Sequence, residues 1–240
     1  MIFDYYEFSN SGGRDYNEDS VGAKLCAGGG IFLVADGLGG LSSGEVASGM
    51  VRDWLIDKFD DSITDVPAWI NENVKAVNDQ ILALEQQQNK KMKSTLVMLT
   101  VLNNNMVFAH SGDSRLYYIH NNELVYFTED HSVAFKKFKA GEIGRDQIGQ
   151  DEDQSSLLRS IGGDDHYEPT IFPYPEQISS GDAFMLCSDG AWEYLKDLEI
   201  LVDKQKSSSA KEWTQRLLLR IMDRVNGKND NLSIVTLIVE

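Results

Sequence analysis

The chain contains few of the residues that build zinc sites, disulfide frameworks or nucleic-acid interfaces. It has 2 cysteines and 4 histidines in 240 residues, and neither set shows the spacing of zinc ligands or of a disulfide scaffold. Basic residues number 22 against 38 acidic ones, for a net charge of −16, which argues against a basic face that binds DNA or RNA. We identify no signal peptide and no apolar run long enough to span a bilayer, so we expect a cytoplasmic protein without membrane partners.

Proline is also scarce, with 4 residues in the whole chain. No proline-rich linker, internal repeat or low-complexity segment divides the sequence. The hydrophobic fraction of 42% is sufficient for a substantial core. We therefore predict a single domain over residues 1–240 and expect a monomer.

What the chain does contain is a series of apolar strands and amphipathic helices. Apolar stripes at helical spacing predict helices that begin at a Ser42-x-x-Glu45 capping box, near Pro67 and near residue 209. Apolar runs bounded by turn residues predict strands at 2–8, 20–26, 30–36, 94–102, 106–110, 115–120, 123–127, 157–161, 183–188 and 232–239. Asparagine turns at 103–105 and 121–122 and a glycine-aspartate break at 111–115 connect the four strands between 94 and 127, which predicts an antiparallel meander.

Several strand–loop junctions carry an acidic residue, often followed by glycine. These acids are Glu18, Asp19, Asp36, Asp113, Asp189 and Asp230. An ordinary Asp-Gly turn explains Asp36 or Asp189 taken alone, and a single acid at a strand end has no special meaning. Several carboxylates gathered at strand ends would repel one another and would require cations. Oxygen ligands without histidine or cysteine favour magnesium, manganese or calcium over zinc, and bridging aspartates suggest a two-metal hydrolytic site.

Two loops each allow two interpretations. Residues 9–19 are polar and glycine-rich and carry Arg14; they form either a solvated loop or a phosphate clamp beside metal-facing carboxylates. Residues 129–156 combine lysines, glycines and a run of acids. They form either a mobile flap or a helix at 132–140 followed by a surface loop.

Eight short motifs follow one another along the chain: residues 14–19 (RDYNED), 36–40 (DGLGG), 94–95 (ST), 111–115 (SGDSR), 130–132 (DHS), 158–162 (LRSIG), 188–190 (SDG) and 230–231 (DN). In this order they resemble the motifs of the metal-dependent serine/threonine protein phosphatases of the PPM family, also called PP2C, in their compact bacterial form. The resemblance covers nearly the whole chain.

This resemblance implies an α+β fold, an α-β-β-α sandwich of two packed antiparallel sheets flanked by helices, with a flap at about 133–156. It also implies two manganese or magnesium ions in a core site. Asp36 would bridge the two ions, and the Gly37 carbonyl would complete the shell of one of them. Asp189 and Asp230 would hold the other ion.

The resemblance assigns roles to four further residues. Arg14 would grip the substrate phosphate, and Glu18 and Asp19 would act mainly through metal-bound waters. Asp113, together with Asp189, would contribute to a third, weaker ion. A hydroxide that bridges the two core ions would attack the phosphorus of phosphoserine or phosphothreonine directly.

The sequence departs from the family's pattern at two positions. Leu38 stands where many eukaryotic members have a histidine proposed as general acid, so we expect a water molecule to protonate the leaving group. Glu193 stands where aspartate is common, which leaves open how the third ion would be completed.

The expected partners are phosphorylated proteins, with a Hanks-type serine/threonine kinase as the opposing enzyme. A catalytically weak relative that binds phosphopeptides or acts as a scaffold is one alternative, but such relatives usually lose metal-binding aspartates. A calcium-binding structural protein is a further alternative, although no segment has the ligand spacing of an EF-hand loop.

Overall fold

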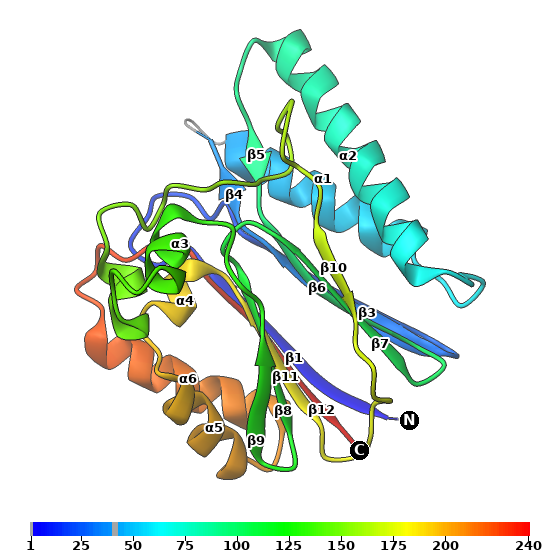
Figure 1. Ribbon diagram of the computed structural model, residues 1–240, viewed down its shortest axis with the longest axis vertical. Helices are drawn as coiled ribbons and strands as arrows, with labels where there is room; N and C mark the ends of the chain where they lie inside the picture. The colour runs from blue at the N-terminus through cyan, green and yellow to red at the C-terminus, as the bar shows by residue number, and fades with distance from the viewer. Residues whose placement is uncertain (1, 40–42) are drawn as a thin grey trace.

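The computed structural model describes residues 2–39 and 43–240. Two five-stranded antiparallel sheets pack face to face, and helices cover the outer face of each sheet (Figure 1). The predicted α-β-β-α sandwich is therefore confirmed. Gly40 of the predicted DGLGG motif and Ser42 of the predicted capping box lie outside the described residues.

The first sheet has the strand order β1-β12-β11-β8-β9. Its strands are β1 (Phe3–Asn10), β12 (Leu232–Val239), β11 (Ala183–Cys187), β8 (Arg115–His120) and β9 (Glu123–Phe127). The helices on its side are α3 (Val133–Lys139), α4 (Asp189–Trp192), α5 (Asp197–Gln205) and α6 (Ala210–Arg224), with a 3₁₀ helix η1 (Arg145–Gln150).

The second sheet has the order β10-β7-β6-β3-β2. Its strands are β10 (Thr170–Pro173), β7 (Asn105–Ser111), β6 (Leu96–Leu102), β3 (Gly29–Ala35) and β2 (Ser20–Cys26). Helices α1 (Ser43–Lys58) and α2 (Val66–Gln88) cover it, and a short pair, β4 (Gly37–Leu38) with β5 (Lys93–Ser94), lies at its end.

The core consists of three apolar layers, one between the two sheets and one between each sheet and its helices. The central strand β3 is buried along its whole length, which explains why its sequence is a continuous apolar run and not an alternating one. Helix α2 begins where the Asp65 side chain accepts a hydrogen bond from the Ala68 N–H and ends at Asn89, which has a positive φ of 52°.

The predicted four-stranded meander is wrong. Strands β6 and β7 form a hairpin in the second sheet, whereas β8 and β9 form a hairpin in the first. The chain crosses between the sheets at residues 112–114, where Gly112 has a φ of +107°. Strand periodicity identifies buried faces but does not state which sheet a hairpin joins, so the sequence pattern was compatible with both arrangements. The asparagine turns are confirmed, with positive φ at Asn103, Asn104, Asn121 and Asn122.

Two other predicted strands differ in the structure. The strand at 94–102 is interrupted at Thr95, so that β5 pairs with β4 and β6 pairs with β3. Residues 157–161 form only isolated bridges, from Leu157 to Ser132 and from Ile161 to Ser94. Strand β10 and helix α5 were not predicted.

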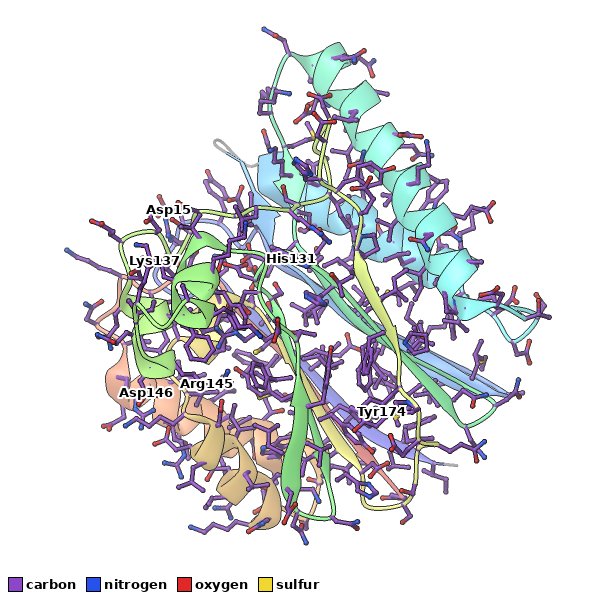
Figure 2. The ribbon with its side chains drawn as sticks, in the orientation of Figure 1. Asp15, His131, Lys137, Arg145, Asp146 and Tyr174 are labelled. Atoms are coloured by element: carbon purple, nitrogen blue, oxygen red, sulfur yellow. The ribbon has the colours of Figure 1, made fainter. Side chains whose placement is uncertain are left out.

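The segment after β9 contains the helix that the sequence allowed at 132–140. Ser132 caps α3 by accepting a hydrogen bond from the Phe135 N–H, and Lys137 pairs with Asp151 and Asp153, each at 2.8 Å. Lys137 and Arg145 lie on the same side of the molecule (Figure 2).

No helix in the described part of the chain is long and apolar enough to cross a membrane.

Candidate active site

The predicted acids gather at one end of the sandwich, where loops from both sheets meet. A cavity of about 470 Å³ there is lined by seven of the eight predicted site residues: Arg14, Glu18, Asp36, Gly37, Asp113, Asp189 and Asp230. The eighth, Asp19, is buried beside them and accepts a hydrogen bond from the Ser188 hydroxyl at 2.7 Å. Residues as far apart in sequence as Arg14 and Asp230, 216 positions, therefore share one cavity.

Backbone and hydroxyl contacts hold Asp36 at the end of β3. Its N–H donates to the Thr95 Oγ1 at 2.9 Å, and the Thr95 N–H donates to its carbonyl at 2.8 Å. The Thr95 hydroxyl also bonds the Ser114 hydroxyl at 2.7 Å. Thr95, at which the predicted strand is interrupted, thus connects the loop that carries Asp36 to the turn that carries Asp113.

Gly37 is a glycine because the backbone approaches so closely there. A Cβ at this position would collide with the carbonyl of Gly44 and would lie 2.5 Å from the carbonyl of Glu18. The Gly37 N–H donates to that Glu18 carbonyl at 3.1 Å, and the Glu18 carboxylate accepts from the Gly44 N–H at 3.2 Å. Any side chain at position 37 would push the loop at Glu18 and the start of helix α1 away from it.

The cluster is unfavourable as a set of bare anions. Burial raises the pKa of Asp36 well above its usual range, and Asp19, Asp189, Asp113 and Asp230 raise it further. Burial likewise raises the pKa of Asp19 to about 7 and the pKa values of Asp113 and Asp189. Such carboxylates remain charged in a folded protein only beside compensating cations.

The residues fit divalent cations held largely by carboxylate, carbonyl and water oxygens. The buried Asp19 Oδ1 has no hydrogen-bond partner in the described part of the chain. The side chains of the acid cluster are carboxylates, so the ligand atoms they could offer are oxygens. Among residues 2–39 and 43–240, no group of three or more His, Cys, Asp or Glu side chains is arranged so that it could hold a metal ion by itself. Magnesium-type sites retain several waters and take few protein carboxylates, so this donor set suits them.

Two hydrogen bonds at the cavity are accepted by acids that are predicted to hold metal ions. The exposed Arg14 guanidinium donates to Asp230 at 2.7 Å. The Gln154 side-chain amide donates to Asp189 at 3.1 Å. Gln154, with Ser155 and Leu157 of the cavity lining, was missed by the sequence analysis, because no local pattern marks a residue that reaches an acid 35 positions away.

Asn231 organises the loop that carries Arg14 and Glu18. Its side-chain oxygen accepts from the Glu18 N–H at 2.8 Å, and its amide donates to the carbonyls of Tyr16 at 2.8 Å and Ser11 at 3.0 Å. Asp230 therefore contributes a carboxylate to the cavity, while its neighbour Asn231 holds the loop at residues 11–18 in place.

Glu193 lies outside the cavity lining. It lines a different cavity of about 800 Å³, beside η1 and the start of α5. Burial raises the pKa of Glu193 to about 8, and Asp189 and Asp230 add to this effect. Glu193 therefore does not line the acid-lined cavity, although it lies close enough to Asp189 and Asp230 for their charges to affect its pKa.

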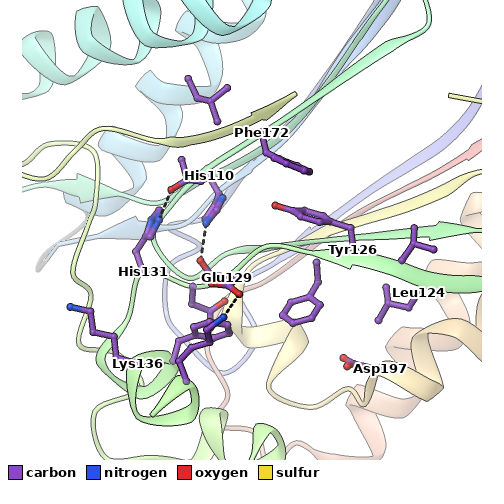
Figure 3. Close-up of a pocket in the computed structure, with 15 residues that line it drawn as sticks. His110, Leu124, Tyr126, Glu129, His131, Lys136, Phe172 and Asp197 are labelled. Atoms are coloured by element: carbon purple, nitrogen blue, oxygen red, sulfur yellow. Dashed lines mark hydrogen bonds and ion pairs between the residues drawn. The ribbon is translucent and has the colours of Figure 1, made fainter. Parts of the chain in front are cut away.

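A third cavity, of about 790 Å³, lies between edge strands β9 and β10 (Figure 3). The rings of His110 and His131 stack there at 4.5 Å, and burial lowers the pKa of His131 to about 3, so this ring is neutral. His131 Nδ1 accepts from the Gly112 N–H at 3.3 Å, and its Nε2 lies 2.9 Å from the Thr170 hydroxyl. His131 therefore braces the turn next to Asp113.

The fold and the acid-lined cavity define a sandwich protein with a candidate metal centre at the loop end of its sheets. The family described as Protein phosphatase 2C matches residues 10–232. The chain is 31% identical over 208 residues to the serine/threonine phosphatase stp of Listeria welshimeri, with 82% of each chain covered. The chain belongs to the protein phosphatase 2C family.

Solved structures agree with this assignment. The serine/threonine phosphatase PstP/Ppp of Mycobacterium tuberculosis superposes with a TM-score of 0.87 at 29% identity, with 100% of each chain covered. The catalytic domain of the serine threonine protein phosphatase PstP in complex with 2 manganese ions gives a TM-score of 0.84 at 28% identity, with 99% of each chain covered.

Proposed function

We propose that this protein is a metal-dependent phosphatase that hydrolyses phosphoserine and phosphothreonine in other proteins. The observation that carries the proposal is the cavity that gathers acids from both sheets beside one exposed arginine. Family membership and the relatives named serine/threonine phosphatases support it. Release of inorganic phosphate from a phosphothreonine peptide tests it; stable peptide binding without phosphate release would favour the scaffold alternative.

The proposed cofactor is a pair of manganese or magnesium ions. Asp36 and the Gly37 carbonyl would hold one ion, and Asp36, Asp189 and Asp230 the other, in keeping with the two manganese ions of the PstP structure. When bound, such ions supply Lewis acidity and make a water-derived nucleophile available at neutral pH.

Three other acids complete the proposed ligand set. Glu18 and the buried Asp19 would hold waters of the ion shells, and Asp113 would hold a third, weaker ion. Asp19 supports this role through its unpartnered Oδ1. Without bound cations these carboxylates would repel a phosphate monoester dianion, so the ions would also be needed for substrate binding.

Two residues of the cavity bear on how the substrate is bound and protonated. Arg14 would orient the phosphate through its planar fork of N–H donors. Leu38 lines the cavity and has no titratable group, so a water molecule would protonate the leaving serine or threonine oxygen.

Arg14→Ala is expected to raise KM for a phosphopeptide about 10- to 100-fold and to lower kcat less. Charge-assisted hydrogen bonds of this kind contribute about 1.5–3 kcal/mol. The Arg14 side chain is 58% exposed, so the fold should lose little. Steady-state kinetics and inhibition by inorganic phosphate measure the effect, with Arg52→Ala as the control, since Arg52 forms a surface pair with Asp53. Unchanged KM and unchanged phosphate inhibition would remove Arg14 from the site.

We also propose that residues 133–156 act as a flap within a single domain. The segment reaches the cavity through Gln154 and Ser155, while Phe135 and Ile148 belong to the core. Positions 135 and 148 are therefore anchored, and the acidic turn at 151–153, which Lys137 holds, directly precedes the two residues that reach the cavity.

Replacing residues 151–153 (DED) with Gly-Ser-Gly is expected to change kcat/KM for phosphopeptides about fivefold, equivalent to about 1 kcal/mol. The change should be smaller for an aryl phosphate, which is too small to reach the flap. The matched control is the same replacement at 60–62 (DDS), in the turn between α1 and α2. Equal losses on both substrates would show that the turn is only structural.

The last part of the proposal concerns the protein's location, oligomeric state and opposing kinase. We propose that the protein acts as a monomer in the cytoplasm and reverses a Hanks-type serine/threonine kinase. The support is its family and the bacterial phosphatases it resembles. Phosphoproteomics of a deletion strain, with and without the kinase, would identify the shared substrates.

A further inference from the structure

Trp192 joins two of the segments that bring acids to the cavity. It ends the one-turn helix α4, which begins at Asp189. Its indole N–H donates to the backbone carbonyl of Asp113 at 2.9 Å. Both Trp192 and Asp113 are 4% exposed, so water does not compete for this hydrogen bond. The turn between the sheets is thereby attached to the helix that carries Asp189.

Arg115 fixes the orientation of this indole. Its guanidinium lies 3.5 Å from the centre of the Trp192 ring. The same guanidinium donates to both carboxylate oxygens of Asp130, at 2.8 and 2.7 Å, and to the Tyr117 hydroxyl at 3.3 Å. The paired hydrogen bonds to Asp130 fix the plane of the guanidinium, and the stack sets the plane of the indole against it.

The turn that carries Asp113 is also held from its other side. Gly112 exchanges two hydrogen bonds with His131, one through each of its backbone groups, at 3.3 and 2.8 Å. Neither Trp192 nor His131 lines the acid-lined cavity. Both therefore act on the site through the backbone that carries Asp113.

We propose that Trp192 is a positioning residue that fixes Asp113 relative to Asp189 and so sets the affinity of the site for its most weakly held divalent cation. This inference rests on the proposed metal-dependent function. A cation shared by two acids from different segments binds best when their separation is set before it arrives. Removing an outer hydrogen bond of this kind typically weakens metal binding about 10- to 100-fold.

The chain contains a matched control for this hydrogen bond. Trp213 on α6 is fully buried, and its indole N–H also donates to a backbone carbonyl, that of Ile200, at 3.1 Å. Trp192→Phe and Trp213→Phe each remove one buried indole–carbonyl bond. Only Trp192→Phe is expected to weaken the weakest manganese site, by about tenfold. Calorimetric titration with manganese and the manganese dependence of the thermal midpoint measure this effect without turnover.

A double-mutant cycle with Asp113→Asn tests whether the effect passes through Asp113. Trp192→Phe should have no further effect on manganese affinity in the Asp113→Asn background. Independent, additive effects, or equal weakening in Trp213→Phe, would overturn the proposal. Trp192→Tyr, which also lacks the indole N–H, replaces Trp192→Phe if that variant does not fold. Failure of the wild-type protein to bind manganese would instead contradict the proposed function, so the two failures are distinguishable.

Discussion

The Asp36→Asn variant is expected to turn over phosphopeptide about a thousandfold more slowly than the wild-type protein, yet to be more stable without metal. Asp36 lies at the centre of the acid cluster and is the residue proposed to bridge two cations. An amide keeps the shape but removes the charge that holds them. A thousandfold loss corresponds to about 4 kcal/mol of transition-state stabilisation, within the range that metal ions supply.

The stability gain follows from the direction of the Asp36 pKa. Burial and the neighbouring acids raise this pKa in the folded state above its ordinary value of 3.8. A carboxyl group that holds its proton more tightly when folded favours folding at low pH. That contribution is lost as the pH rises from about 4 through the raised pKa. Asparagine has no such dependence, so the variant should lose less stability between pH 5 and pH 8.

Thermal unfolding in a chelator at pH 5 and pH 8 measures this difference. Asp79→Asn is the control, because Asp79 is an exposed partner of Lys75 on α2, and it should change neither turnover nor the pH dependence. Wild-type turnover by Asp36→Asn in manganese would show that Asp36 is only a turn residue. A variant less stable than the wild type at pH 8 would contradict the electrostatic argument.

Arg115→Met is expected to lower the free energy of unfolding by about 3–5 kcal/mol, the usual effect of breaking a buried ion pair by removing one partner. The Arg115 and Asp130 side chains are 5% and 0% exposed, and their closest charged atoms are 2.7 Å apart. Burial works against the Arg115 charge, but Asp130 and Tyr117 together outweigh this effect and keep the pKa of Arg115 above its usual range. The variant would leave the Asp130 carboxylate buried and unpaired.

Urea denaturation of three variants tests this reasoning. Arg115→Met combined with Asp130→Leu should recover most of the loss, because an apolar pair of similar volume avoids the unpaired charge. Arg52→Met, which breaks an exposed ion pair, should cost at most about 1 kcal/mol. A loss below about 1 kcal/mol for Arg115→Met alone would mean that water reaches Asp130 in the folded protein.

The strands and long helices could be predicted because their signals are local. Strand β12 lies at Leu232–Val239, the range that its apolar run indicates, and helix α2 carries Pro67 in its first turn. The assignment of hairpins to sheets depends on contacts between distant segments. Strand β10 has only four residues, and three of them are exposed or half-exposed apolar side chains, so its sequence carries little strand signal.

More of the candidate site than of the strand topology could be predicted from the sequence. Its acids stand at the ends of apolar strands, beside glycines that the backbone requires, as at Asp36 and Gly37. The contacts that hold these acids in place are different. Gln154 and Trp192 reach their partners across 35 and 79 residues, and nothing in the sequence next to either residue indicates which partner it meets.

The central claim is that the acid cluster uses divalent cations to hydrolyse a phosphate ester, and the metal requirement tests it most directly. Initial rates of phosphate release from a phosphothreonine peptide should disappear after exhaustive chelation and return with added manganese or magnesium. All proposed ligands are oxygens, which these cations prefer. Undiminished turnover in the chelated protein, or recovery with zinc alone, would contradict the account.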